Sequence, residues 1–421
     1  MSSWKWNPDQ DHDADPVLPR RERRALKTQR SSQSRNEMQH ALEADARVAM
    51  WLASPLDVHT AQALIRLQSL PDLQRMAIMP DVHPAADVCV GCVLGTAEIV
   101  YPAAIGGDIG CGMSAIAIAD TDEPSLADRE AILKEFNRSI DVARRSHKRD
   151  AVQAADMPDP QDLVQPHLRK LATGDGVGQL GTLGRGNHFV ELQRDESGTL
   201  WLMVHSGSRF MGQAVAGYYD RVAKAEGVRS MIAGLRRDSE AAVGYLADQT
   251  WCVRYATANR MQMLAAGAEA VQKVIGGRIS WKGTLDVPHN FIAIEGHNGS
   301  DLVIHRKGAA PAHAGSVGLI PGSAGTMSVH VVGKGESASL ASSSHGAGRT
   351  RSRSDARHHV SETDVRQQMK DVTFDEARSR AMRDEAPSVY RDLRIVMEAQ
   401  RDLVTITRIL KPLVSFKATG E

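Results

Sequence analysis

Glycine is the residue whose distribution most constrains what this chain can fold into. The sequence has 35 glycines, and many stand in short clusters beside apolar, strand-like runs. Because glycine lets the backbone turn tightly and approach a ligand closely, such clusters indicate loops rather than helices. Glycine-rich strand-and-loop segments are predicted at 174–210, 283–333 and 340–354. They lie between and after two helix-rich stretches, at 120–147 and 212–276, where charges separate apolar positions.

Apolar periodicity predicts the remaining elements. The N-terminal part is predicted to hold two helices and two short strands, the helices over 36–53 and 60–67 and the strands over 76–80 and 88–94. One amphipathic helix is predicted over 386–410, because Pro387 suits its first turn and Pro412 follows its end. Helices and strands alternate irregularly, which argues against a βαβ repeat. The predicted fold is therefore α+β, a single compact domain over 36–421 with mixed or antiparallel sheets and surrounding helices.

The first 35 residues are polar and of low complexity, which predicts a poorly ordered tail. Basic side chains crowd its second half, at Arg20, Arg21, Arg23, Arg24, Lys27, Arg30 and Arg35. A solvated arm is the plain interpretation, and contact with nucleic-acid phosphates is the alternative. Over the whole chain 51 basic residues balance 51 acidic ones, so any basic surface must be local.

Several features indicate a cytoplasmic protein without a membrane partner. No apolar run approaches the ~20 residues that a membrane helix needs, and the N-terminus lacks the layout of a secretory signal. Four cysteines do not make a disulfide framework. Cys89 and Cys92 form a CxxC motif without a second one, so they, like Cys252, are predicted to be small buried core residues.

The sixteen histidines divide by local context. A surface position is predicted for those in polar or helical stretches, namely His12, His40, His59, His147, His167, His358 and His359. Six of the others lie in turn-like or glycine-flanked strings, at His83, His188, His205, His289, His305 and His345. Because several such loops adjoin strand-like runs, we expect them to converge on one pocket.

Asp108 and Cys111 are the firmest metal-ligand candidates. They are separated by two residues in a glycine-rich turn, so both can face one point. Imidazole, carboxylate and thiolate bind divalent ions well, and a thiolate can bridge two of them. A small buried core residue is the alternative for Cys111 taken alone. These ligand types suit zinc or cobalt as well as manganese.

Ten strings between about Met76 and Lys417 resemble, in order, those of the RtcB family of RNA ligases. They are MPDVH, PAAIGGDIGCGM, GTLGRGNHFVE, HSGSR, HN, HRKGA, IPGSAGTMS, SSHGAGR, APSVYRD and SFK. The resemblance implies an enzyme that joins an RNA 3′-phosphate or 2′,3′-cyclic phosphate to a 5′-hydroxyl. It also implies GTP and two Mn²⁺ ions as cofactors and a covalent histidine–GMP intermediate, with a cyclic phosphate hydrolysed first.

The resemblance implies roles for matching residues. His345 is expected to be the guanylylated nucleophile, while Asp81 either orients a hydroxyl or water or caps a turn. The expected metal ligands are Asp108 and His188 on one ion, His205 and His289 on the other, and Cys111 on both. The expected GTP-binding residues are Asn187, Phe189, Glu191, Ser323, Ser328, Gly346, Tyr390 and Lys417. Arg209 and Arg349 are expected to clamp RNA phosphates bidentately, with His83, His305 and Lys307 as pocket neighbours.

The chain departs from the family pattern at three places: Pro84–Asp87 after MPDVH, Arg185 before Gly-Asn-His, and Ala324 in the Pro-Gly-Ser loop. None removes an expected ligand or the nucleophile, but together they leave the substrate and nucleotide preference open, with RNA repair as the alternative to tRNA splicing. Two further hypotheses are a dinuclear phosphodiesterase that opens cyclic phosphates without ligation, and a decayed scaffold that only binds RNA. The expected partners are tRNA halves or cleaved RNA, GTP and an archease-like activator, with a monomeric enzyme.

Overall fold

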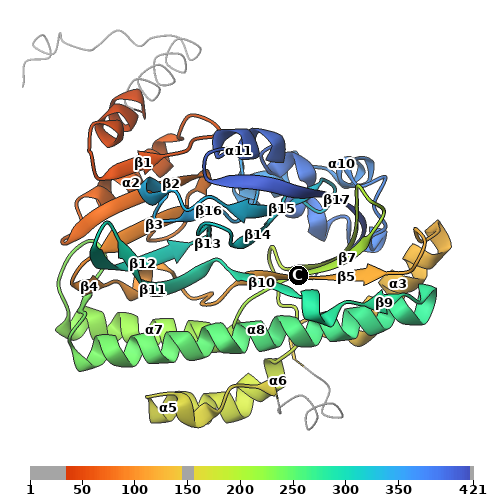
Figure 1. Cartoon of the computed structure of the whole chain (residues 1–421), viewed down its shortest axis with the longest axis horizontal. Coiled ribbons are helices and arrows are strands. Elements are labelled where there is room, and N and C mark those ends of the chain that lie inside the picture. The colour runs from red at the N-terminus through yellow and green to blue at the C-terminus, as the bar shows by residue number, and fades with distance from the viewer. Residues whose placement is uncertain (1–34, 145–155, 418–421) are drawn as a thin grey trace, which may run out of the picture.

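The computed structural model of the chain describes residues 35–144 and 156–417 (Figure 1). Of the tail predicted over residues 1–35, only Arg35 lies within these ranges. His12 and His147 lie outside them. Within the described ranges, no helix is both long and apolar enough to cross a membrane.

Two large sheets form the centre of the fold. The five-stranded sheet is mixed, because only its first pair is parallel, and has the order β1 (Val48–Met50), β2 (Leu73–His83), β3 (Val90–Thr96), β12 (Ser300–Lys307), β11 (Asn290–His297). The eight-stranded sheet is antiparallel, with the order β10 (Leu285–Pro288), β5 (Gly112–Ala119), β7 (Leu200–Ser206), β6 (Phe189–Asp195), β17 (Val404–Lys417), β15 (Ser328–Gly333), β14 (Val317–Pro321), and β9 (Arg278–Ile279) beside β5. Two small sheets pair β4 (Ile99–Val100) with β8 (Leu235–Arg236) and β13 (Ala309–Pro311) with β16 (Ser342–Ser344).

Helices cover the sheets from the outside. They are α2 (Val58–Gln68), α3 (Leu126–Ser139), α5 (Pro166–Leu171), α6 (Val177–Gln179), α7 (Arg209–Glu226), α8 (Glu240–Ile275), α9 (Arg353–His359), α10 (Glu362–Gln368) and α11 (Leu393–Ala399). The 36-residue helix α8 runs beside α7 along one face of the molecule (Figure 1). It packs against β5 and β7, where Leu264 and Met263 join the core with Ile116 and Leu202. This arrangement confirms the predicted α+β class.

Two predicted helices are wrong. The helix predicted over 36–53 ends at residue 43, and the chain then forms strand β1. The helix predicted over 386–410 is a short 3-10 turn at Pro387–Val389, helix α11 and then the long strand β17. Pro412 lies in strand β17 at a shift in the register between β17 and β6. Proline cannot donate a hydrogen bond to a neighbouring strand, and such an irregularity tolerates it.

Within the described residues, two predictions are confirmed: that the core cysteines are buried, and that the surface histidines are exposed. Cys89, Cys92 and Cys252 are buried thiols. His40, His59, His167, His358 and His359 are exposed. The helix predicted over 60–67 is also confirmed, as α2.

Candidate active site

Strand topology brings the predicted metal ligands to one edge of the eight-stranded sheet. Strands β10, β5, β7 and β6 are neighbours and antiparallel, so the end of one lies beside the start of the next. Cys111 immediately precedes β5, and His188 immediately precedes β6. His205 lies near the end of β7, paired with Met113, while His289 follows β10. Ligands separated by up to 181 positions therefore meet because four strands share one edge.

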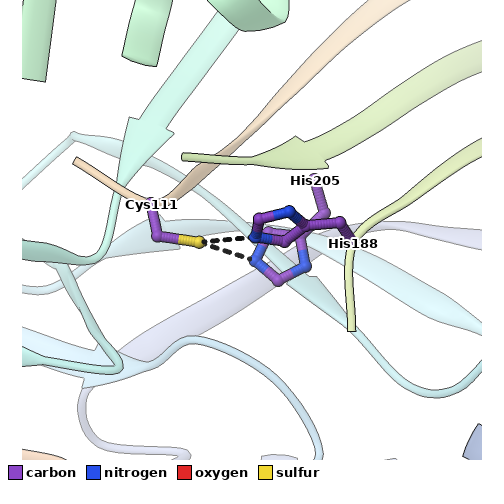
Figure 2. A group of neighbouring side chains, drawn as sticks. All are labelled: Cys111, His188 and His205. Atoms are coloured by element: carbon purple, nitrogen blue, oxygen red, sulfur yellow. Dashed lines mark hydrogen bonds between the residues drawn. The ribbon is translucent and has the colours of Figure 1, made fainter. Parts of the chain in front are cut away.

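The side chains of Cys111, His188 and His205 converge (Figure 2). Cys111 Sγ lies 3.6 Å from His188 Nε2 and 3.2 Å from His205 Nε2. On one side His188 Nε2 is 3.3 Å from Asp108 Oδ2, and on the other His205 Nε2 is 3.3 Å from His289 Nε2. The sulfur thus stands between two pairs of ligand atoms, which is the geometry that a thiolate bridging two ions requires.

Main-chain carbonyl groups fix the orientation of two imidazole rings. His188 Nδ1 is 2.8 Å from the Leu183 carbonyl oxygen, and His205 Nδ1 is 3.1 Å from that of Asn187. Each Nδ1–H donates to its carbonyl, so each Nε2 keeps a lone pair directed toward Cys111. Hydrogen bonds of this kind are typical of metal-binding histidines.

Burial keeps the imidazoles of His205 and His289 neutral. It lowers the pKa of His205 and of His289 well below the usual value for histidine, and neighbouring histidines lower both further. Burial raises the pKa of the Cys111 thiol, as does nearby Asp108. For Asp108, burial acts to raise the pKa, but the hydrogen bond and charge of His188 outweigh it and bring the pKa to about 2. Neutral imidazoles and an ionised carboxylate are the forms that bind a cation, and a bound cation would ionise the thiol.

Gly207 makes room for the Asp108 carboxylate. A Cβ atom at this position would overlap Asp108 Oδ1 and lie 3.2 Å from the Cα atom of Cys111. We therefore expect Gly207→Ala to weaken Mn²⁺ or Co²⁺ binding by on the order of 10- to 100-fold, measured by isothermal titration calorimetry. Gly174→Ala is the matched control, because a Cβ at Gly174 meets no atom within 4 Å. Equal metal affinity in the Gly207 variant and the wild type would contradict this role.

His345 and Asp81 lie beside the metal-ligand cluster. The rings of His345 and His289 are 4.7 Å apart between centroids. His345 Nδ1 is 2.7 Å from Oδ2 of the fully buried Asp81, at an angle outside hydrogen-bond geometry, and the His345 main-chain N–H donates to the same oxygen at 3.3 Å. Asp81 therefore holds the Nδ1 side of the ring and leaves Nε2 free. Strand β16, which ends at Ser344, sets the position of His345 along the chain.

A cavity of about 760 Å³ adjoins His345. Seven of the eight predicted GTP-binding residues line it, namely Asn187, Phe189, Glu191, Ser323, Gly346, Tyr390 and Lys417. The remaining one, Ser328, does not line the cavity, and its hydroxyl accepts a hydrogen bond from Gln193 at 3.1 Å. Cavities of this volume are typical of nucleotide-sized ligands. His205 and His345 stand in the cavity wall, so the ligand would meet the metal-ligand cluster.

A buried carboxylate, Glu385, organises one end of this cavity and was not predicted from the sequence. Its oxygens lie 2.6 Å from Lys417 Nζ, 2.6 Å from the Tyr390 hydroxyl and 2.6 Å from Arg353 Nη1. Arg349 Nη1 is 3.2 Å away, and its guanidinium lies over the Tyr390 ring. Burial acts to raise the pKa of Glu385, but these cations lower it to about 2. The only signal in the sequence is its position immediately before the APSVYRD string.

Arg349 and Arg209, the predicted phosphate clamps, lie in different places. Arg349 lines the cavity beside Tyr390, whereas Arg209 does not line it. Arg209 begins helix α7 with a left-handed backbone (φ 57°) and donates to Thr182 Oγ1 at 3.3 Å. His305 is a buried structural histidine whose Nε2 accepts from the main chain of Tyr101, while His83 lines the cavity.

Glu191 is a buried acid with few compensating contacts. It accepts hydrogen bonds from Gln193 and Ser415 at 2.9 and 3.0 Å. Burial outweighs these bonds and the charge of Lys417, and raises the pKa of Glu191 to about 7. Its ionisation state therefore changes near neutral pH.

Glu191→Gln is expected to alter how stability depends on pH. The pKa of Glu191 is about 7 in the folded protein and about 4.3 in the unfolded chain. The group therefore stabilises the fold at low pH. That stability is lost as the pH rises through 7. Between pH 5 and 8.5 the variant should gain on the order of 2 kcal/mol in unfolding free energy relative to the wild type, measured by urea denaturation. Exposed Glu130→Gln should show no such gain, and a pH-independent difference for Glu191→Gln would contradict the assignment.

Comparisons with known proteins agree with the geometry. The family model described as tRNA-splicing ligase RtcB matches residues 63–418. The chain is 34% identical to the RNA-splicing ligases RtcB1 and RtcB of two Escherichia coli strains, over 89% of this chain and 98% of each relative. It is 27% identical to the tRNA-splicing ligase RtcB of Archaeoglobus fulgidus, over 80% of this chain and 86% of that protein. The chain therefore belongs to the RtcB family of tRNA-splicing ligases.

Proposed function

We propose that the protein is a GTP- and Mn²⁺-dependent RNA ligase that joins 3′-phosphate or 2′,3′-cyclic phosphate ends to 5′-hydroxyl ends. The observation that carries this proposal is the position of His345. It stands in the wall of the nucleotide-sized cavity, and its ring lies 4.7 Å from that of the predicted metal ligand His289. The proposed nucleophile, the predicted metal ligands and a cavity of nucleotide size are thus contiguous. Family membership supports RNA as the substrate class.

The donor set suits two divalent ions. Asp108 and His188 would hold one, His205 and His289 the other, and Cys111 both, in keeping with the Nε2 and Sγ distances. His205 Nε2 and His289 Nε2 lie 3.3 Å apart, close enough for one cation to bind both nitrogens. Two ions in this position would neutralise charge on the phosphate oxygens of bound substrates.

His345 is the nucleophile in this proposal. Its Nε2 attacks the α-phosphorus of GTP, a P–N bond forms, and the bond to the departing pyrophosphate breaks. Asp81, 2.7 Å from Nδ1, stabilises the positive charge that develops on the ring. An oxygen of the RNA 3′-phosphate then attacks the phosphorus of the histidine-bound GMP, and the P–N bond breaks. The 5′-hydroxyl oxygen attacks the phosphorus of this activated 3′-phosphate and displaces GMP. A cyclic phosphate is first opened by water to the 3′-phosphate.

The part of the cavity lined by Tyr390, Phe189, Lys417 and Glu191 would hold the guanine. Tyr390 and Phe189 offer aromatic faces, and Lys417 and Glu191 offer a donor and an acceptor. Adenine does not present the same pattern of donors and acceptors, so these polar groups can select GTP. Arg349 lies over the Tyr390 ring and so belongs to this part of the cavity. Arg209 remains the proposed clamp for RNA phosphate.

The test is a joining assay with an RNA that has a 2′,3′-cyclic phosphate end and a partner that has a 5′-hydroxyl end. Joined product is expected with GTP and Mn²⁺, but not with ATP in place of GTP or after chelation. The competing phosphodiesterase hypothesis predicts opening of the cyclic phosphate without GTP and no joined product. That outcome would refute ligation by this protein.

A further inference from the structure

Helix α8 carries two consecutive, fully buried polar residues, Asn259 and Arg260, next to the metal-ligand cluster. No part of the proposed chemistry uses either. Burying a guanidinium is costly unless its donors are satisfied, so the partners of Arg260 indicate what it does.

The guanidinium of Arg260 connects three separate segments. Nη1 donates to the main-chain carbonyls of Gly110 at 2.8 Å and Ser206 at 3.0 Å. Nε and Nη2 donate to the two carboxylate oxygens of Asp286 at 2.8 and 3.0 Å, and Nη2 also donates to Thr257 at 3.2 Å. Two of the three segments are thus held by their backbone.

The two main-chain partners of Arg260 each adjoin a proposed metal ligand. Gly110 immediately precedes Cys111, and Ser206 immediately follows His205. A shift of either carbonyl would therefore move the neighbouring ligand atom.

The third segment that Arg260 binds, at Asp286, leads to the proposed metal ligand His289. Asp286 lies on β10, three residues before His289. The main-chain N–H of His289 donates to the carbonyl of Cys111 at 2.8 Å, so these ligand segments also brace each other.

Asn259 reaches a fourth ligand, His188. Its Nδ2 donates to the carbonyls of Thr182 and Gly207 at 3.2 Å each and to the Ser206 hydroxyl at 3.1 Å. That hydroxyl donates at 2.9 Å to the carbonyl of Leu183, which is the carbonyl that orients the ring of His188.

We propose that Asn259 and Arg260 are positioning residues that set the spacing of the metal ligands. The Asn259–Arg260 pair fixes, from one rigid helix, the backbone beside Cys111 and His205, and through Leu183 and Asp286 it reaches His188 and His289. Ligand spacing must be held closely for a metal site to keep its affinity. This inference rests on the proposed metal centre.

The test compares Arg260→Lys with the wild type by titrating the metal-free, full-length protein with Co²⁺ and following the thiolate-to-cobalt absorption. Lysine keeps the charge beside Asp286 but cannot reach both carbonyls with a planar fork. We expect about 10- to 100-fold weaker Co²⁺ binding by the folded variant. The control is Arg254→Lys on the same helix, where Arg254 makes an exposed ion pair with Asp162 at 3.1 Å. The affinity of this variant should match that of the wild type.

Wild-type affinity in folded Arg260→Lys would overturn the proposal. If that variant does not fold, Ser206→Ala decides, because it removes only the hydroxyl between Asn259 and the Leu183 carbonyl. Weaker binding there supports the pair's role, and unchanged binding refutes it. A wild-type protein that binds no Co²⁺, or whose Co²⁺ absorption survives Cys111→Ser, would instead refute the metal centre on which the pair acts.

Discussion

His345→Ala is expected to abolish formation of the covalent guanylate, with a loss of about 10³-fold or more, as for other enzyme nucleophiles. The reason is positional as well as chemical. His345 lines the cavity, and its Nδ1 lies 2.7 Å from the Asp81 carboxylate. His83 also lines the cavity, but its Nδ1 is hydrogen-bonded to the main-chain carbonyl of Asp81 and not to the carboxylate. The rate of joining should fall with the adduct, because the ligation proposed here proceeds through it.

The measurement is incubation with Mn²⁺ and α-labelled GTP, followed by denaturing gel electrophoresis and an acid-lability test of the labelled band. His359→Ala is the matched control, since His359 is exposed on α9, and it should retain the adduct. A labelled adduct that persists in His345→Ala would contradict the assignment of the nucleophile.

The same variant separates the two enzymatic hypotheses. His345 is not among the residues proposed to hold the ions, so His345→Ala should still bind metal and open a 2′,3′-cyclic phosphate. Opening that survives without joining would show that the metal cluster and the nucleophile serve different steps. Loss of both activities together would indicate instead that His345 supports the metal cluster.

Only part of the metal-ligand cluster was predictable from residue patterns. The residue types and spacing of Asp108 and Cys111 indicate ligands in a glycine-rich turn, whereas the ligand roles of His188, His205 and His289 came from the resemblance to the RtcB family. The distance between these loops was not predictable from residue patterns. It depends on the order β10-β5-β7-β6 in the sheet, which is a property of long-range strand pairing.

The wrong helix over 386–410 shows how proline can mislead. Pro387 and Pro412 fit a helix start and a helix stop, but Val404, Thr405, Ile406 and Thr407 are β-branched and favour a strand. Strand β17 gains hydrogen bonds on both edges, from β15 and β6. Tertiary pairing thus outweighed the apparent helical pattern.

Partners of buried polar groups were the least predictable part of the site. Glu385 lies 32 residues from Lys417 and 36 from Arg349 along the chain, yet contacts both. Asn259 and Arg260 read as ordinary polar residues of a long helix, and only the fold places the Gly110 and Ser206 carbonyls against them. Such contacts have no signature in residue spacing.

Cys111→Ser is expected to remove high-affinity metal binding, with at least about 100-fold weaker Mn²⁺ or Co²⁺ affinity, and to reduce joining accordingly. The sulfur lies 3.6 Å from His188 Nε2 and 3.2 Å from His205 Nε2, so its loss affects both proposed ions. A serine hydroxyl remains protonated near neutral pH and cannot supply the negative charge that a bridging thiolate would.

Proton release gives this prediction a second readout. Because burial raises the pKa of the Cys111 thiol in the metal-free protein, binding must displace its proton, and wild-type affinity should rise with pH. Calorimetry in buffers of different ionisation enthalpy would measure the released proton. Cys92→Ala is the matched control, since Cys92 is a buried core thiol on β3, and it should keep both the affinity and the proton release. Wild-type affinity with unchanged proton release in Cys111→Ser would mean that the sulfur is a core residue and not a ligand.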